Sequence, residues 1–237
     1  MKKLFPILQP AITVVFILIA CLVYGLSLAP AILFFNYINE IVNIESLLLN
    51  ALYVGSMLSM CFFIFGISLV FIVGIIVRFL PIKTKPGVYP LASLSVIKWG
   101  LCGAFLRLVT LTFLDFITPT FLNIIYFRLI GAKIGKNVQI NTININDPWL
   151  LDIGDGSVIG GGSSINCHTV ERGNLILERV KIGKKCTIGA QSLIWPGCSI
   201  GDRSILATKS VLKKRTIVGD KEIWKGNPAV NVRNRDK

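Results

Sequence analysis

The hydrophobic pattern of this chain changes along its length, from two long uncharged runs to a period of six residues. No charged side chain occurs between Ala11 and Tyr37, or between Ser46 and Val77. From Ile134 onward the aliphatic residues recur at every sixth position instead. The pattern predicts two long apolar helices followed by a domain of short, repeated strands.

Each uncharged run is long enough to cross a bilayer, because a hydrocarbon core of about 30 Å needs roughly 20 helical residues. The mean hydropathy of +0.70 is also high for a soluble domain. A cleaved signal peptide is the alternative for the first run, but that run is longer than the apolar region of a signal peptide and lacks an obvious small-residue cleavage site. We expect a transmembrane helical hairpin over residues 1–85.

Basic residues flank the two predicted spans on the outside of the hairpin. The connector between the spans carries Glu40 and Glu45 and no Lys or Arg. The outer flanks carry Lys2, Lys3, Arg78, Lys83 and Lys85. Because cytoplasmic flanks are enriched in Lys and Arg, the pattern predicts both ends of the hairpin, and everything after it, in the cytoplasm.

Residues 86–132 remain apolar but carry Lys98, Arg107, Asp115 and Arg128. A third spanning helix would bury Arg107 and Asp115, which is costly at the centre of a bilayer. We therefore expect amphipathic helices that lie in the membrane interface and are interrupted near Pro119. The segment is either a linker or a platform that presents a membrane-bound substrate. The sequence does not decide whether it lies on the membrane or crosses it.

The six-residue period occupies residues 133–237, together with a C-terminal tail, and predicts a parallel β-helix. In such a fold short strands meet at tight corners, the aliphatic residue points into a triangular prism, and a following Gly permits the corner. The aliphatic positions are Ile134 and Ile140, then Ile153, Ile159 and Ile165, then Ile176, Ile182, Ile188, Ile194, Ile200, Leu206 and Leu212.

This register resembles the left-handed β-helix of the hexapeptide-repeat acyltransferases over residues 131–232, including the closing motif Gly226, Asn227, Pro228 and Ala229. A narrower resemblance is to polysaccharide O-acetyltransferases and to the membrane modules at the carboxyl end of ε-polylysine synthase-like enzymes. It rests on Pro86, Gly87, Tyr89, Pro90, Trp99, Asn123, Arg128, Leu129, Gly131 and Ala132, and on the run His168, Glu171, Gly173 and Leu175. This sequence shows one such module and neither an adenylation nor a carrier domain, so we expect that polymer synthesis does not carry over.

The resemblance implies an acyl transfer enzyme, which the uncharged runs and the flanking charges would place at the bacterial cytoplasmic (inner) membrane with its catalytic domain facing the cytoplasm. It implies acetyl-coenzyme A, or another acyl-CoA, as donor, with no metal, and a homotrimer with active sites between neighbouring subunits. The acceptor is a hydroxyl or amine of a membrane-associated molecule, such as a lipid-linked sugar, a polysaccharide precursor or an amino compound.

The six-residue phase breaks between Ile165 and Ile176, eleven residues apart, and this stretch contains the chain's single histidine, His168. A loop leaving a rigid scaffold is a common place for a catalytic group, and a histidine accepts protons near neutral pH. The resemblance implies that His168 takes the proton of the attacking acceptor. Glu171 would orient the imidazole, or it is a solvated loop carboxylate.

The resemblance places the donor along the later coils. Small residues at Gly189, Ala190, Ala207 and Thr208 match the steps that line the pantetheine groove of related enzymes. Lys209 stands where a Gly is common, which puts the shape of that groove in doubt. Coenzyme phosphates would pair with the basic cluster of Lys213, Lys214, Arg215 and Lys225.

A second irregularity separates Ile140 from Ile153, thirteen residues apart rather than twelve. The residues Asp147, Pro148 and Trp149 lie there and form either a structural corner or part of the acceptor pocket. Three residues close to His168 in the sequence are chemically possible nucleophiles: Ser163, Ser164 and Cys167. The resemblance implies direct acyl transfer without an acyl-enzyme, so we expect Cys167 to be a packing residue.

Charge and composition narrow the remaining function classes. Residues 133–237 hold 17 Lys and Arg against 9 Asp and Glu, which favours anionic partners. No nucleic-acid motif accompanies this charge, so coenzyme phosphates and an anionic membrane surface explain it better. Three alternatives are an amide-forming transfer from a carrier-protein thioester, a non-catalytic β-helical scaffold, and a zinc-dependent carbonic anhydrase, which would need several histidines.

Overall fold

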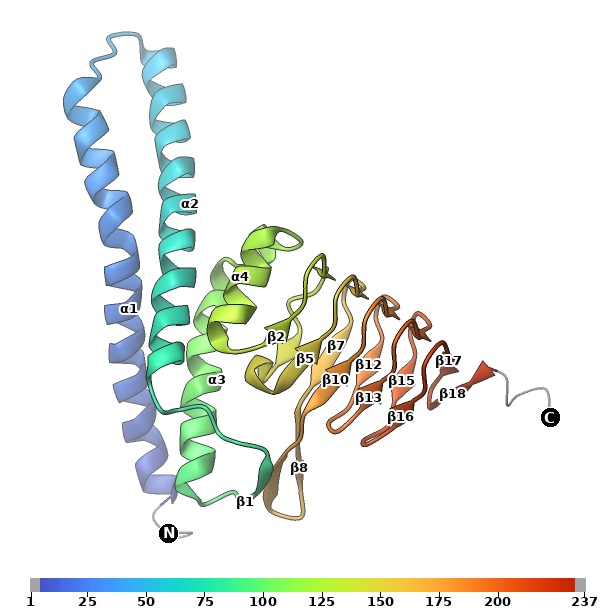
Figure 1. The fold of residues 1–237 in the computed structure, drawn as a ribbon. Helices are drawn as coiled ribbons and strands as arrows, with labels where there is room; N and C mark the ends of the chain where they lie inside the picture. Colours follow the sequence, from blue (N-terminus) through green and yellow to red (C-terminus); the bar gives the residue numbers. More distant parts are fainter. Residues whose placement is uncertain (1–4, 233–237) are drawn as a thin grey trace. The chain divides into compact units, whose positions relative to one another are not determined.

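The computed structural model describes residues 5–232, and their side chains from residue 10 onward. Lys2 and Lys3, which entered the orientation argument, lie outside the described residues. The chain forms two compact units, Met1–Ile76 and Val77–Lys237. The first contains the helical hairpin and the second contains shorter helices and a β-helix (Figure 1).

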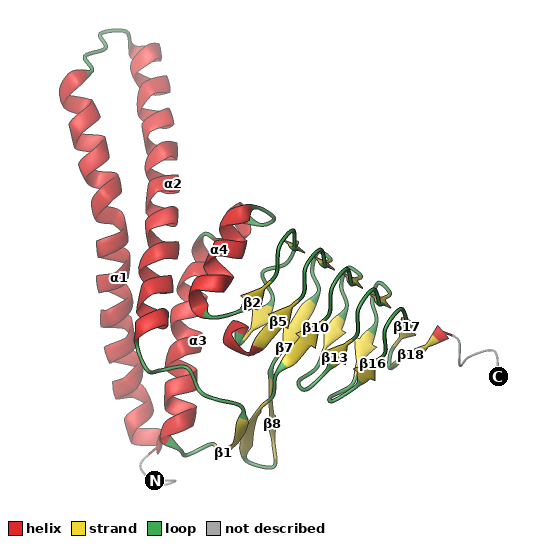
Figure 2. Ribbon diagram, viewed as in Figure 1, coloured by secondary structure: helices red, strands yellow, loops and turns green. Residues whose placement is uncertain are grey.

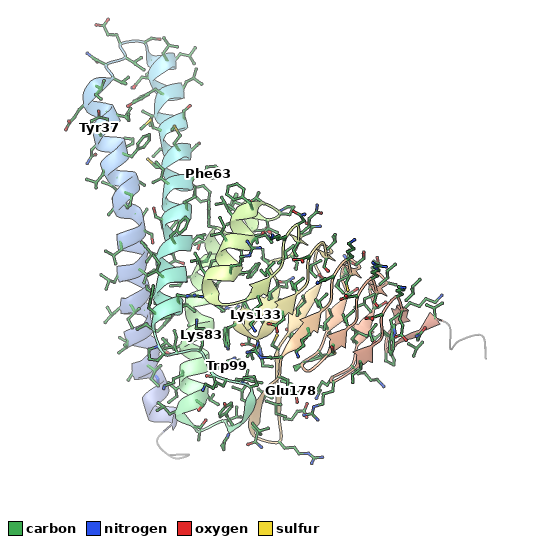
Figure 3. All side chains as sticks on the ribbon, viewed as in Figure 1. Tyr37, Phe63, Lys83, Trp99, Lys133 and Glu178 are labelled. Carbon is green, nitrogen blue, oxygen red and sulfur yellow. The ribbon has the colours of Figure 1, made fainter. Side chains whose placement is uncertain are left out.

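The hairpin consists of α1 (Phe5–Ile41) and α2 (Leu47–Phe79). Apolar side chains cover its outer surface, as Tyr37 and Phe63 illustrate (Figure 3). Within the described residues, three helices are long and apolar enough to cross a membrane: α1, α2 and α3 (Leu94–Thr112). The predicted apolar hairpin is therefore confirmed.

The second unit begins with β1 (Gly87–Pro90), α3, a 3-10 turn η1 (Leu114–Ile117) and α4 (Phe121–Ile130). The predicted interruption near Pro119 lies between η1 and α4, where the Thr120 hydroxyl caps α4 by accepting from the Leu122 amide. Gly131 ends α4 in the left-handed conformation. The Asn123 side chain donates to the Ile140 carbonyl at 2.8 Å, so α4 covers the first coil.

Coils of short strands follow and build three sheets, which are parallel except for one antiparallel strand at the end of the chain's last coil (Figure 2). The strands that build the coils are β2 (Lys133–Ile134), β3 (Gln139–Ile140), β4 (Ile145–Asn146), β5 (Leu151–Ile153), β6 (Val158–Ile159), β7 (Ser164–Asn166), β10 (Val180–Ile182), β11 (Thr187–Ile188), β12 (Leu193–Ile194), β13 (Ser199–Ile200), β14 (Ile205–Leu206), β15 (Val211–Leu212), β16 (Ile217–Val218), β17 (Ile223–Gly226) and β18 (Ala229–Asn231). The sheets have the orders β16-β13-β10-β5-β2, β18-β17-β14-β11-β6-β3 and β15-β12-β7-β4. The predicted left-handed parallel β-helix is confirmed.

The predicted aliphatic positions form the core of this prism, except for Ile176 and for Ile134, which is half-buried in the first strand. Ile159, Ile165, Ile194 and Leu212 are fully buried. Ile176 is not a core position of the prism, because it lies in a hairpin that leaves the coils; the prism register resumes at Ile182, which pairs with Ile153. The six-residue spacing from Ile176 to Ile182 therefore includes residues of an inserted hairpin and is not a repeat of the prism.

The glycines that follow the aliphatic positions have a different role from the one predicted. The left-handed conformation falls two residues later, at Asn137, Gly156, Gly162, Lys185, Gln191, Gly197, Arg203, Lys209, Arg215 and Lys221. A Cβ at Gly189 would instead lie less than 3.0 Å from the Thr208 backbone on the next coil. These glycines therefore permit close stacking of coils, and Lys209 adopts the corner conformation with φ 57°.

An antiparallel sheet of three strands stands beside the prism. Its strands are β8 (His168–Glu171), β9 (Asn174–Leu177) and β1, in the order β1-β9-β8. Arg172 and Gly173 make the two-residue turn between β8 and β9, both with positive φ, as a tight hairpin turn with the twist of its strands requires. The segment expected as a loop is thus a β-hairpin.

Candidate active site

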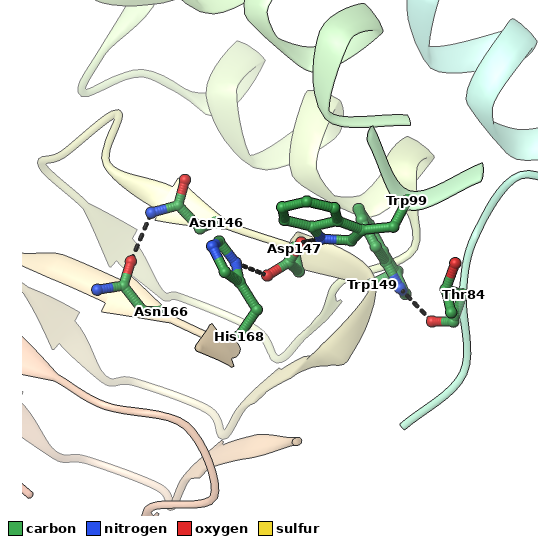
Figure 4. Close-up of polar contacts among 7 residues, drawn as sticks. All are labelled: Thr84, Trp99, Asn146, Asp147, Trp149, Asn166 and His168. Atoms are coloured by element: carbon green, nitrogen blue, oxygen red, sulfur yellow. Dashed lines mark hydrogen bonds and ion pairs between the residues drawn. The ribbon is translucent and has the colours of Figure 1, made fainter. Parts of the chain in front are cut away.

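His168 lies at the start of β8 and contacts a buried carboxylate. Its Nδ1 lies 2.5 Å from Oδ2 of Asp147 (Figure 4). The Asp147 side chain is 5% exposed and that of His168 is 27% exposed. Because a carboxylate accepts, the proton belongs on Nδ1, which leaves Nε2 as the basic nitrogen.

Asp147 is positioned by backbone conformation and by a second donor. It adopts a left-handed conformation, φ 56° and ψ 56°, immediately before the 3-10 turn η2 (Pro148–Leu150). The Trp99 indole of α3 donates to its Oδ1 at 2.7 Å. Both carboxylate oxygens are therefore engaged, one by the imidazole and one by the indole.

The aromatic side chains tie this pair to the segments before the β-helix. Trp99 also meets the His168 ring edge to face, with ring centroids 4.9 Å apart. Trp149, two residues after Asp147, donates from its indole to the Thr84 carbonyl at 2.9 Å (Figure 4). The imidazole is thus held by Asp147 at the end of the first coil and by Trp99 of α3, while Trp149 joins the same coil to the residues before β1.

A cavity of about 720 Å³ opens beside the imidazole. One wall is formed by α3 from Trp99 to Leu111. The other wall is formed by residues 143–147 of the first coil, with Ser164 and His168. Asn146 on this wall donates to Asn166 at 2.5 Å, so the outer face beside His168 is polar.

Glu171 does not have the position that the sequence analysis gave it. Its carboxylate pairs with Lys214 and accepts from the Thr169 hydroxyl. Residues three apart on a strand point to opposite faces, so β8 turns Glu171 away from the face that carries His168. The carboxylate at Nδ1 is Asp147, which the sequence analysis assigned to a structural corner or to the acceptor pocket and not to a contact with His168.

The nearby thiol and hydroxyls divide into buried groups and one cavity-lining group. Burial, and secondarily the charge of Asp147, raise the pKa of the Cys167 thiol well above its usual range. The Ser163 hydroxyl is buried and donates to the Gly160 carbonyl. Ser164 lines the cavity. These environments favour packing for Cys167, as expected.

The small residues predicted to line the donor groove share one corner of the prism, on adjacent coils. Gly189 and Ala190 follow β11, and Ala207 and Thr208 follow β14 on the adjacent coil. The Lys209 amide donates to the Ala190 carbonyl at 2.9 Å, which joins the two steps. Lys225 lies in β17 of the same sheet.

Lys213 and Lys214 lie at another corner, after β15, where the β8–β9 hairpin leaves the prism two coils earlier. Lys214 is paired with Glu171, and the neighbouring Arg215 is paired with Glu178 at 2.6 Å. The basic cluster is therefore divided between corners, and two of its members already have carboxylate partners. Within residues 5–232 no three His, Cys, Asp or Glu side chains gather as metal ligands would.

The chain is similar to known proteins along most of its length. The sequence model of the bacterial transferase hexapeptide family (six repeats) matches residues 179–214. The delta-poly-L-ornithine synthetase of Acinetobacter baumannii (strain AB307-0294) is 28% identical over 180 residues, which cover 76% of this chain and 13% of the synthetase. This chain thus spans a small part of that relative's length.

A shorter relative is matched over most of its own length. The putative colanic acid biosynthesis acetyltransferase WcaF of Escherichia coli (strain K12) is 30% identical over 133 residues, covering 46% of this chain and 72% of that protein. Aligned solved structures include a maltose O-acetyltransferase from Clostridium difficile 630, with 18% identity, a TM-score of 0.48 and coverage of 62% of this chain and 91% of that one. Galactoside acetyltransferase in complex with coenzyme A aligns with 17% identity, a TM-score of 0.45 and coverage of 64% and 89%. The chain belongs to the bacterial hexapeptide-repeat family of acyltransferases.

Proposed function

We propose that the protein transfers an acyl group, in particular acetyl, from coenzyme A to a hydroxyl or amine of a membrane-associated acceptor, such as a lipid-linked glycan. The observation that carries the proposal is the Asp147–His168 pair, whose free imidazole nitrogen belongs to a residue lining a cavity of about 720 Å³. A general base next to a space for substrate is the minimum that direct acyl transfer requires.

In the proposed reaction, Nε2 of His168 removes the proton from the acceptor as its oxygen or nitrogen attacks the thioester carbonyl. The tetrahedral intermediate then collapses, the carbon–sulfur bond breaks, and the imidazolium returns the proton to the departing thiolate. Asp147 stabilises the imidazolium that forms between these steps. The buried thiol of Cys167 is not needed as a nucleophile.

The donor is proposed to lie along the stacked small residues Gly189, Ala190, Ala207 and Thr208, with Lys213 and Lys225 available to its phosphates. A homotrimer is proposed because a single face of a prism forms only half of a cleft. Native mass spectrometry of the detergent-solubilised protein would then report three 26.1 kDa chains.

The proposed location is the bacterial cytoplasmic membrane, with the β-helix in the cytoplasm where acyl-CoA is available. The charges around the hairpin support this orientation, since the connector holds Glu40 and Glu45 while Arg78, Lys83 and Lys85 follow α2. Helices long and apolar enough to cross a membrane support the anchoring itself.

A second candidate reaction is an amide-forming transfer from a carrier-protein thioester. The similarity to the delta-poly-L-ornithine synthetase, over 76% of this chain, favours it. The same general base would serve, and only the donor and the acceptor nucleophile would differ.

The test uses the full-length protein in detergent micelles with acetyl-coenzyme A, and follows the release of free thiol with and without membrane lipid extract. We expect release that depends on the extract and falls by about 10²- to 10⁴-fold in His168→Ala. Equal release from both proteins would remove His168 from the reaction. If neither protein released thiol, the carrier-protein thioester would replace coenzyme A as the proposed donor.

A further inference from the structure

The cavity beside His168 has one wall made by a helix that is apolar enough to cross a membrane. The cavity-lining residues of α3 include Gly100, Gly103, Arg107 and Leu111, which recur at helical spacing and share one face. A Cβ added at Gly100 or Gly103 would meet nothing within 4 Å. The small residues therefore leave open space in the cavity, whereas Arg107 places a charge at its edge.

Arg107 has no carboxylate partner within ion-pair distance among residues 10–232. The one carboxylate that lines the same cavity is Asp147, and both of its oxygens are engaged by His168 and Trp99. Ionisable residues in apolar helices are costly, and they usually face a water-filled cavity and a charged partner. The cavity thus offers an uncompensated cation to an anionic ligand.

The two ends of the cavity differ in polarity. Near His168 the wall is polar, with Asn144, Asn146 and Ser164. At the other end it reaches Leu111, whose side chain is 73% exposed, close in sequence to the 65% exposed Phe116. A ligand that fits both ends has a polar group at His168 and an apolar part that leaves past Leu111.

We propose that the cavity binds a lipid-borne acceptor through its phosphate, which Arg107 holds while the reacting hydroxyl lies at Nε2 of His168. This inference rests on the proposed acyl transfer and names the class of acceptor. Trp99, which contacts His168, precedes Arg107 by eight residues, or about 12 Å along the helix axis. A sugar between phosphate and reacting hydroxyl fits that separation, and the hydrocarbon chain leaves along the exposed apolar residues.

The experiment measures Kd by titration calorimetry on the detergent-solubilised full-length protein with two probes that differ only in the phosphate: a polyprenyl phosphate and the corresponding polyprenol. We expect the wild type to bind the phosphate about 10- to 100-fold more tightly than the alcohol. Arg107→Gln is expected to remove this preference, and Arg107→Lys to keep part of it, because a Lys retains the charge but not the bidentate geometry.

Three controls separate the possible explanations. Gly103→Leu fills the open space next to Arg107 and is expected to weaken both probes. Lys98→Gln also removes a cation of α3, but Lys98 does not line the cavity, so both Kd values are expected to stay near those of the wild type. His168→Ala is expected to bind the polyprenyl phosphate normally, even though it loses acyl transfer. Failure of transfer with intact phosphate binding would therefore count against the proposed reaction and not against the site.

The inference is overturned if wild type binds the two probes equally, or if Arg107→Gln keeps the preference for phosphate. A soluble sugar phosphate forms the last arm of the experiment. If glucose 1-phosphate binds as tightly as the polyprenyl phosphate, a phosphate site exists but its ligand is not lipid-borne, which would also reject the inference as stated.

Discussion

At the scale of single residues, the contact between Asp147 and His168 depends on the register of two parallel strands. Asn146 of β4 pairs with Asn166 of β7, so the residues that follow these strands emerge side by side. The left-handed conformation of Asp147 then directs its carboxylate toward the imidazole. A shift of one strand by one residue would turn its side chains to the opposite face and separate the pair.

Asp147→Asn tests this contact, because the amide is isosteric with the carboxylate but does not stabilise an imidazolium. We expect kcat to fall by about 10²- to 10⁴-fold, with little change in the KM for acetyl-coenzyme A. The measurement is thiol release at saturating donor.

Glu171→Gln provides the matched comparison, since it also removes one carboxylate near His168 in sequence. Its ion pair with Lys214 is on the exposed side of β8, so activity is expected to stay within about threefold of wild type. A loss as large as that of Asp147→Asn would restore Glu171 to the role that its sequence position suggested.

Cys167 is predicted to resist alkylation in the native protein. Its side chain is fully buried, and burial together with the Asp147 charge raises the pKa of the thiol. A raised pKa means that the reactive thiolate forms only at a higher pH than for a free cysteine, so little should be present at about pH 8.5. Peptide mass spectrometry after iodoacetamide treatment should find Cys167 modified in denatured protein and unmodified in native protein; equal labelling would contradict this environment.

At the scale of elements, the sequence predicts the coils more reliably than the segments that leave them. The six-residue period recurs without a break from Ile182 to Leu212, so this stretch alone is enough to predict the prism. The hairpin could not be predicted, because Ile176 lies by coincidence six residues before Ile182. The segment β8 is a strand because it pairs with β9, which in turn pairs with β1. This strand conformation is what places His168 and Glu171 on opposite faces.

Gly189→Ala tests the close stacking of coils. The added methyl group would collide with the backbone of Thr208 at the corner of the next coil, which the hydrogen bond from the Lys209 amide to the Ala190 carbonyl holds in place. We expect a loss of stability of about 1–3 kcal/mol or more, measured as a lower midpoint of thermal unfolding in detergent.

Gly103→Ala is the appropriate reference for that measurement, since its new methyl group enters open space in α3. A helix gains roughly 0.5–1 kcal/mol from this replacement, so the midpoint should hold or rise. If both variants behaved alike, the Gly after each aliphatic residue would not be required by stacking.

At the scale of the whole molecule, the chain combines an apolar hairpin with a unit that carries the complete Asp147–His168 pair. Hydropathy predicted the apolar hairpin, because uncharged runs long enough to form such helices are visible in a single sequence. It did not predict that Trp99 and Thr84 would contact the end of the first coil. Contacts between residues 48 and 65 positions apart leave no periodic signal in one sequence.

The orientation of the chain in the membrane is open to direct labelling. We expect a membrane-impermeant maleimide, added to intact spheroplasts, to label Glu45→Cys in the connector and to leave Lys221→Cys in the β-helix unlabelled until the cells are opened. Both side chains replaced are outside the predicted spans. Unmodified protein serves as the background, and the reverse pattern would place the β-helix outside the cytoplasm.

The pairing of β1 with β9 also sets the smallest piece of this protein that could be transplanted. The hairpin bearing His168 is one edge of a sheet whose opposite edge is Gly87–Pro90, and Trp99 follows that edge strand. A chimera joined at residue 133, where the repeats begin, would lack both β1 and Trp99. His168 would then lose the strand that completes its sheet and the indole that contacts its ring. Anyone recombining such modules should cut near residue 77 instead, so that the framework travels with the site.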